Sequence, residues 1–358
     1  MRRIIYIIVF ITLTAQPSFS IYHKEAGDTC KVLFMGNSYT LYNHLPSLFK
    51  GLSRTANKTV LTDDHLVEGT GVSDWSASND VEELIKSEAW DYAVIQGSVT
   101  VAYPEYYSSA RVFESLEVLK DKIISNFDST KIIYIMPWAF EDGMTWMGWD
   151  DDYSDMQEKI YINTLKYCNE LNIVIAPVGW AWYSVLEEKQ YPLHYLHMED
   201  YNHPSPRGSY LMACVLYSVI FLESPAGIPF FSLLPEEEAR YFQQVAGDVV
   251  FKNPTNWNLP DVKVGIGSMN EDNIILGQNY PNPARGLTRI DYNTSISGFV
   301  ELSVFNSNGV KCYELVNEYA RAGDYSVIFD CCCLTAGLYY YVLRSGNEIV
   351  TRRMVIVD

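Results

Sequence analysis

The stretch "KVLFMGNSYTLYNHLP", residues 31–46, decides the fold. Its apolar run, residues 32–35, predicts a buried strand that stops at Gly36. Asn37 and Ser38 follow at once, ahead of a predicted helix. Because glycine permits a sharp turn, the pattern is typical of a strand that passes directly into a helix in an α/β sheet. Ser38 then lies beside the free N–H groups of a helix start, either as an activated hydroxyl or as an ordinary N-cap residue.

The composition limits the class of protein. The chain has 358 residues, 48% hydrophobic and 20% charged, as in a folded protein long enough for two domains. Asp and Glu number 44 against 26 Lys and Arg, which gives a net charge of −18. So acidic a chain repels phosphate backbones, and we expect no nucleic-acid partner.

The first twenty residues are typical of an export signal. Arg2 and Arg3 precede an apolar run, residues 4–13, and a small-x-small triplet ends at Ser20. We therefore expect a signal peptide over residues 1–20, cleaved before Ile21. The run is too short for the alternative, a membrane anchor, which needs roughly 20 apolar residues. The sequence does not indicate which of the seven cysteines would pair in disulfides, and buried free thiols are an equal alternative to disulfides.

Strands and helices alternate from residue 31 to about 251. The apolar runs 32–35, 92–95, 131–136 and 173–177 predict strands, and the periodic segments 45–55, 108–126, 155–171 and 206–221 predict helices. Such alternation predicts one α/β domain, residues 21–252, with a parallel sheet covered by helices on both faces. Ligands bind beyond the carboxyl ends of the strands in such sheets.

The composition then changes. Residues 253–273 are rich in Asn, Pro, Gly and Asp, and they predict a linker. After them come short alternating runs, 288–292, 299–305, 325–329, 338–343 and 348–357, separated by turn signals such as Asn308-Gly309. We expect a small all-β sandwich over residues 274–358.

Three motifs in this last segment carry a resemblance. "QNYPNP" at 278–283, "LTAGLYY" at 334–340 and the ending with Arg352 and Arg353 resemble the C-terminal sorting domain of the type IX (Por) secretion system of Bacteroidetes. The resemblance implies the outer-membrane type IX machinery as a partner. It implies a secreted or surface protein of a Gram-negative bacterium. The alternative is a carbohydrate-binding sandwich, which would expose an aromatic row such as Tyr339-Tyr340-Tyr341.

A serine hydroxyl is a weak nucleophile unless a base takes its proton, so a histidine is required. Among six histidines, His203 has distinctive company, because Asp200 precedes it by three residues in a loop. Such a segment can fold back so that the carboxylate orients one ring nitrogen while the other faces the nucleophile. A structural loop histidine is the alternative.

Together these motifs resemble the SGNH (GDSL-like) hydrolases, in a branch with Gly-Asn-Ser. The matching blocks are "GNSYTLYNHLP" (36–46), "WDYAVIQGS" (90–98) and "DYNHPSPRGSYLMACVLY" (200–217). The resemblance implies a flavodoxin-like sheet, with Ser38 as nucleophile, His203 as general base and Asp200 as its orienting acid. It also implies an oxyanion hole built from the Ser38 N–H, a glycine, here Gly71 or its rival Gly69, and an Asn side chain. That Asn is missing, and we expect Gln96 in its place, with Ser98 as the alternative donor.

The substrate is less well defined. Asn37 and the tryptophans that follow strands, Trp138 and Trp180 above all, are expected to contact it, with simple packing as the alternative for the tryptophans. We expect a monomeric secreted serine esterase that needs no cofactor and removes acetyl or short acyl groups from glycans or small molecules. Two rivals are a glycan-binding protein on a decayed hydrolase fold and a zinc hydrolase using the cluster His194, His197, Glu199, Asp200 and His203.

Overall fold

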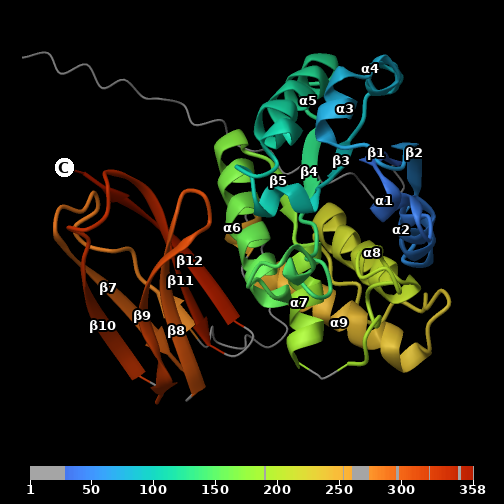
Figure 1. Cartoon of the computed structure of the whole chain (residues 1–358). Coiled ribbons are helices and arrows are strands. Elements are labelled where there is room, and N and C mark those ends of the chain that lie inside the picture. The colour runs from blue at the N-terminus through green and yellow to red at the C-terminus, as the bar shows by residue number, and fades with distance from the viewer. Residues whose placement is uncertain are drawn as a thin grey trace, which may run out of the picture.

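The structure is a computed structural model that describes residues 29–188, 191–252, 254–259, 274–295, 298–321, 323–345 and 348–357. The expected signal peptide and most of the expected linker lie outside the described residues. Within the described ranges no helix is both long and apolar enough to cross a bilayer. An α/β unit and a β-sandwich lie side by side (Figure 1).

A five-stranded parallel sheet forms the centre of the α/β unit. Its spatial order is β2-β1-β3-β4-β5, the flavodoxin-like order. The strands are β1 (Cys30–Gly36), β2 (Val60–Leu66), β3 (Tyr92–Gln96), β4 (Lys131–Ile135) and β5 (Val174–Ala176). The expected α/β fold is therefore confirmed. β2 was not expected, because it is an edge strand whose half-exposed sequence VLTDDHL has little apolar character.

Helices cover both faces of this sheet. α2 packs on α8, which also contacts α9, while α3 and α4 pack on α5 at the opposite face (Figure 1). The helices are α1 (Ser38–Leu41), α2 (Leu45–Thr55), α3 (Val72–Ala77), α4 (Asn79–Lys86), α5 (Val112–Asn126), α6 (Tyr153–Leu171), α7 (Val178–Glu188), α8 (Pro206–Phe221) and α9 (Glu236–Lys252). Short 3₁₀ turns are η1 (Val99–Ala102), η2 (Ser108–Ala110), η3 (Thr145–Met147) and η4 (Pro254–Trp257). The helix expected from residue 108 begins at Val112, because Arg111 adopts a left-handed φ of 42°.

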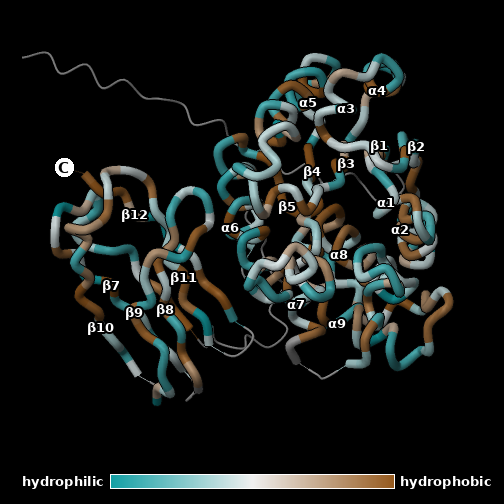
Figure 2. Tube along the Cα trace, viewed as in Figure 1, coloured by the Kyte–Doolittle hydropathy of each residue, from teal (hydrophilic) through white to brown (hydrophobic). Residues whose placement is uncertain are grey.

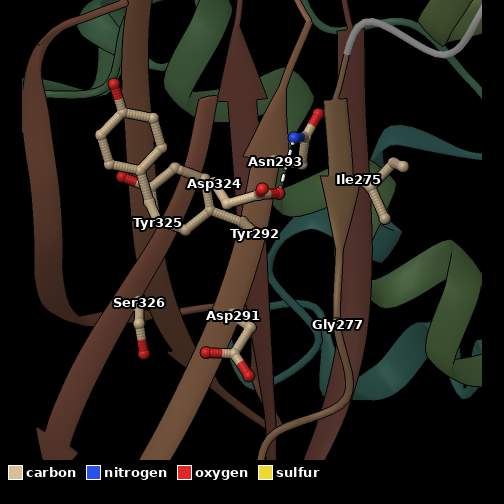
Figure 3. A pocket seen from close by; sticks show the side chains of 8 residues that line it. All are labelled: Ile275, Gly277, Asp291, Tyr292, Asn293, Asp324, Tyr325 and Ser326. Carbon is tan, nitrogen blue, oxygen red and sulfur yellow. Dashed lines mark hydrogen bonds between the residues drawn. The ribbon is translucent and has the colours of Figure 1, made fainter. Parts of the chain in front are cut away.

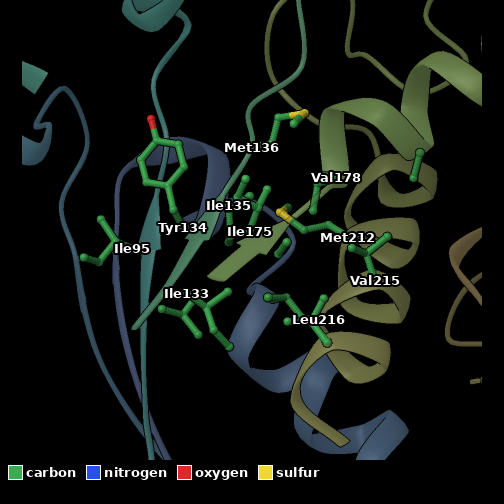
Figure 4. Close-up of a cluster of buried hydrophobic side chains, with 14 of the residues drawn as sticks. Ile95, Ile133, Tyr134, Ile135, Met136, Ile175, Val178, Met212, Val215 and Leu216 are labelled. Atoms are coloured by element: carbon green, nitrogen blue, oxygen red, sulfur yellow. The ribbon is translucent and has the colours of Figure 1, made fainter. Parts of the chain in front are cut away.

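The core lies between the sheet and α8. Ile133, Ile135 and Ile175 of the strands face Met212 and Leu216 of the helix, and all are fully buried (Figure 4). Figure 2 shows the hydrophobic segments gathered between the layers and hydrophilic ones along the outer loops. Burying such side chains stabilises the fold by about 1.5–3 kcal/mol each. This packing holds the strands in place, and the candidate site lies at their carboxyl ends.

The C-terminal part forms the expected antiparallel sandwich. One sheet has the order β10-β7-β6 and the other β12-β11-β8-β9. The strands are β6 (Ile274–Leu276), β7 (Leu287–Thr294), β8 (Gly298–Asn306), β9 (Lys311–Ala320), β10 (Gly323–Asp330), β11 (Gly337–Ser345) and β12 (Glu348–Ile356). The Asn308-Gly309 turn joins β8 to β9, with Gly309 at a φ of 77°. β9 was missed because it is an edge strand with no regular alternation of buried residues.

Candidate active site

Ser38 lies where β1 passes into α1. Gly36 is required at this turn, because a Cβ on it would stand 2.5 Å from the Thr40 Oγ1. Asn37 caps the helix: its Oδ1 accepts a hydrogen bond from the Tyr39 N–H at 3.0 Å. Its Nδ2 donates to the Thr70 carbonyl at 3.1 Å and so ties the turn to the loop after β2. Ser38 is the first helical residue, half-buried at the carboxyl edge of the sheet.

Asp200 and His203 belong to a tight turn before α8. One carboxylate oxygen of Asp200 accepts from the N–H groups of Asn202, at 3.0 Å, and His203, at 2.9 Å. The other oxygen lies 2.6 Å from the His203 Nδ1. Ser205 caps the following helix and Pro206 is its first residue, which fixes where the turn ends.

The two segments meet at the serine. The His203 Nε2 lies 2.8 Å from the Ser38 Oγ, although 165 residues separate them along the chain. When the His203 Nδ1–H donates this hydrogen bond to the Asp200 carboxylate, the Nε2 is free to accept the serine hydroxyl proton. The structure thus brings together the three residues that the sequence singled out for a nucleophile, base and orienting acid.

Two tyrosines hold the His203 ring, and sequence reasoning missed both. The Tyr42 ring stacks on the imidazole with centroids 4.5 Å apart, and the Tyr39 ring meets it edge-on at 5.6 Å. The Tyr39 hydroxyl donates to the Asn202 Oδ1 in the histidine turn. Both tyrosines follow Ser38 within one helical turn, so the segment "SYTLY" carries the nucleophile and the walls around its base.

Electrostatics favour an ionised acid in this group. Partial burial raises the pKa of Asp200, but hydrogen bonds from the His203 backbone, the His203 ring and the Asn202 N–H outweigh it, so the pKa lies below its usual range. Asp200 is therefore a carboxylate at neutral pH.

The expected oxyanion donors Gln96 and Gly71 make hydrogen bonds elsewhere in the fold. The Gln96 side chain is buried; its Nε2 donates to the Gly97 carbonyl at 2.7 Å and its Oε1 accepts from Thr40. The Gly71 N–H donates to the Asp74 carboxylate at 2.8 Å as part of a capping box. Both donors thus already make hydrogen bonds within the fold. A sequence motif does not show such contacts, because they depend on how neighbouring groups are placed in space.

The two rival donors lie elsewhere in the same loops. Ser98 caps η1 and its Oγ accepts from the Thr100 N–H at 3.4 Å. Gly69 is exposed, with a φ of 71°. The backbone donor at the serine itself is the Ser38 N–H, at the start of α1, because the N–H groups of Tyr39, Thr40 and Leu41 donate to Asn37.

The expectation that the tryptophans contact substrate is wrong. Trp138 and Trp180 are buried rather than presented to a substrate. Trp138 stacks between Tyr39 and Trp182, at 4.7 and 4.2 Å, and its Nε1 donates to the Asn202 carbonyl at 2.9 Å. It therefore supports the histidine turn from beneath, which is the packing alternative.

The other histidines of the expected cluster point to different partners. His194 pairs with Glu141 through its Nδ1 at 2.7 Å. His197 is buried, and its Nε2 lies 2.9 Å from the Ala139 carbonyl. Within the residues that the structure covers, no group of three or more His, Cys, Asp or Glu side chains is arranged as a metal site.

One exposed and three half-buried aromatic side chains gather in the loops after β3 and β4. Tyr106, 54% exposed, meets Tyr107 and Trp149 edge-on at 4.8 and 5.2 Å, and Trp149 meets Tyr103 at 5.0 Å. We call Tyr103, Tyr106, Tyr107 and Trp149 the aromatic cluster. Burial raises the pKa of Tyr39 well above its usual range, and the negative charge of Asp200 raises it further.

The sandwich carries a separate shallow groove between β6, β7 and β10 (Figure 3). Tyr292 and Tyr325 stack there at 5.1 Å, beside an Asn293–Asp324 hydrogen bond. Its lining residues are Ile275, Gly277, Asp291, Tyr292, Asn293, Asp324, Tyr325 and Ser326. The run Tyr339-Tyr340-Tyr341, which the carbohydrate-binding alternative would expose, is buried.

Comparison with known families identifies the C-terminal part. The family described as "Secretion system C-terminal sorting domain" matches residues 278–357. This match confirms the expected sorting domain and indicates a secreted or outer-membrane surface protein. No curated protein matches the chain in sequence.

Solved structures resemble the α/β unit. A DUF4886 family protein from Bacteroides uniformis is 17% identical, with a TM-score of 0.52, over 63% of this chain and 96% of that one. A protein from Slackia heliotrinireducens proposed to be an SGNH hydrolase is 22% identical, with a TM-score of 0.42, over 53% and 98%. An acetylxylan esterase from Geobacillus stearothermophilus is 18% identical, with a TM-score of 0.43, over 56% and 98%. At these identities the likeness to the first of them establishes a shared fold.

Proposed function

We propose that this chain is a secreted serine esterase of the SGNH type. The observation that carries the proposal is the chain of contacts from the Ser38 Oγ to the His203 Nε2, at 2.8 Å, and from the His203 Nδ1 to Asp200, at 2.6 Å. A hydroxyl, an imidazole and a carboxylate in this order form an activated nucleophile. The sorting domain supports an extracellular substrate.

The steps follow from these contacts. His203 takes the hydroxyl proton as the Ser38 Oγ attacks the ester carbonyl, while Asp200 stabilises the imidazolium that forms. The Ser38 N–H, at the start of α1, stabilises the oxyanion. His203 then protonates the leaving alcohol, and the same base activates water to release the acid from the acyl-enzyme.

The finer proposal is that the ester is an acetyl or other short acyl group on a glycan. The aromatic cluster supports it, because the exposed Tyr106 ring and its half-buried neighbours offer apolar faces with polar edges, which suit sugar rings. Tyr106, the most exposed of them, lies in the loop after β3, and β3 is a neighbour of β1 in the sheet. A small soluble ester remains the competing substrate.

Hydrolysis of a chromogenic acetyl ester tests the reaction. The wild-type chain is compared with Ser38→Ala, with and without a chelator. We expect turnover that survives the chelator and is lost in Ser38→Ala. Turnover that the substitution leaves unchanged would refute the assignment of Ser38, and turnover lost in chelator would favour a metal hydrolase.

A second function, a glycan-binding protein without catalysis, is favoured by one observation. The Gln96 amide and the Gly71 N–H are both engaged elsewhere, and loss of one oxyanion donor typically lowers the rate by about 10²–10³. This alternative predicts that the chain binds acetylated oligosaccharides with equal affinity in wild type and Ser38→Ala while hydrolysing no ester.

A further inference from the structure

A strand of the sandwich is buried on both faces. Antiparallel strands at a domain surface usually alternate between buried and solvated residues, yet residues 339–343 of β11 are all buried. Tyr339, Tyr341 and Leu343 belong to the core of the sandwich. Tyr340 and Val342 belong instead to the core of the α/β unit, as do Phe305 of β8 and Ile349 of β12. The outer face of this sheet is therefore an apolar contact surface.

Helix α6 presents the matching surface. A helix at the edge of an α/β unit should keep one polar, solvated face. In α6, however, Glu158, Asn163 and Thr164 are buried along with the apolar residues. Figure 1 shows α6 between the parallel sheet and the sandwich, which explains why it is covered on opposite sides.

A buried ion pair crosses this interface. The Arg344 Nη2 of β11 lies 2.9 Å from the Glu158 Oε1 of α6, with side chains 18% and 10% exposed. The Arg344 guanidinium also lies 6.0 Å from the centre of the Tyr183 ring. Burial raises the pKa of Glu158, although the charge of Arg344 partly offsets it. Losing one partner leaves the other as an uncompensated buried charge, which is strongly destabilising.

The β8–β9 turn extends the interface toward the catalytic face. The Lys166 Nζ donates to the Ser307 carbonyl at 2.9 Å, and the Asn163 Nδ2 donates to the carbonyls of Ala102 and Asn308, each at 3.4 Å. The Asn308 side chain donates to Glu105. Glu105 lies between Tyr103 and Tyr106, so the turn contacts the segment that carries most of the aromatic cluster.

We propose that the C-terminal domain is more than an address: it docks on α6 as a structural part of the enzyme and supports the 99–110 segment beside the active site. Its release would expose the apolar face of the sheet and an unpaired Glu158. The mature protein therefore gains stability and an ordered aromatic cluster as long as this domain stays bound.

Docking is tested on the full chain with a specific protease site inserted between residues 260 and 273. We expect the two halves to elute together after cleavage, with the melting temperature nearly unchanged. Arg344→Ala should lower that temperature by about 6 °C or more and let the cut halves separate. Arg289→Ala is the matched control, because Arg289 pairs with Asp291 at an exposed site and should change neither result. The proposal would be overturned if the halves of the wild-type chain separate directly after cleavage, or if Arg344→Ala leaves the melting temperature unchanged.

Support of the 99–110 segment is tested with Asn308→Ala in the uncut chain. We expect chymotrypsin to cleave after the tyrosines of this segment about two- to tenfold faster than in wild type, as for a lost hydrogen bond. Asn293→Ala, which removes an amide from the distant groove, is the control. An unchanged cleavage rate would overturn this part. Asn308→Ala should also raise KM for an acetylated oligosaccharide, and this expectation rests on the proposed function. The cleavage and elution experiments do not depend on esterase activity, so failure of one proposal can be told from failure of the other.

Discussion

His197 should make the fold sensitive to mild acid. Burial lowers its pKa from 6.5 to about 4, although the Ala139 carbonyl opposes the shift. Its Nδ1 is buried without a hydrogen-bond partner, and a carboxylate oxygen of Glu141 lies 3.9 Å from it. A proton on this nitrogen is therefore poorly compensated, and the folded state keeps the ring neutral.

The sign and size of the effect follow. Between pH 6.5 and 4 the unfolded chain binds a proton at His197 that the folded chain does not, so stability falls as pH falls through this window and is constant above it. For these two pKa values, the free energy of unfolding drops by about 2 kcal/mol between pH 7 and pH 5 from this residue alone.

The assay compares urea unfolding of wild type and His197→Gln at both pH values. Glutamine retains a donor for the Ala139 carbonyl but has no proton to gain. We expect the variant to be less stable at pH 7 yet to lose about 2 kcal/mol less than wild type on going to pH 5. His44→Asn, at an exposed histidine, is the control and should follow wild type. Equal acid losses in wild type and His197→Gln would refute the reasoning.

The remaining predictions concern the catalytic face. Asp200→Asn should lower kcat for an acetyl ester by roughly 10²–10⁴ with an unchanged melting temperature, because the amide no longer fixes the His203 tautomer; a kcat within threefold of wild type would contradict this. Tyr42→Ala should lower kcat by up to about tenfold through loss of the ring stacked on His203, while Tyr42→Phe keeps the rate. Tyr106→Ala should raise KM for an acetylated oligosaccharide by up to about tenfold and leave kinetics on a small ester unchanged, whereas equal effects on both substrates would argue against a sugar contact.

The fold could be predicted from the sequence where a strand is buried on both faces, because its sequence is then apolar without interruption. The runs around Val32, Val94 and Ile133 are central strands covered on both faces, so their apolar character was unambiguous. Edge strands such as β2 and β9 have only one neighbour and much exposed surface, and their sequences carried no such pattern.

The proposed nucleophile, base and acid could be singled out from the sequence for a different reason. Each lies in a short segment whose local chemistry is distinctive: a glycine turn before Ser38, and a carboxylate three residues before His203. The oxyanion donors could not be singled out in this way, because their availability depends on contacts such as Gly71 with Asp74 and Gln96 with Gly97. The tryptophans failed for the same reason, since only packing decides whether a ring such as Trp138 faces substrate or core.

The interface between the two domains left a trace in the sequence that pattern reasoning did not use. The run Leu338 to Leu343 is apolar without interruption, which is unusual for an antiparallel strand with a solvated face. Its partner surface on α6 became evident only once both elements were placed in space.

Covalent labelling tests the central claim, that Ser38 is the nucleophile, most directly. The full chain is treated with a fluorophosphonate, which reacts with activated serines, and the modified residue is located by mass spectrometry. We predict one modification, on Ser38, that is lost in His203→Ala because the hydroxyl then lacks its base. Esterase activity in a chain that stays unmodified at Ser38, or is labelled at another serine, would contradict this account.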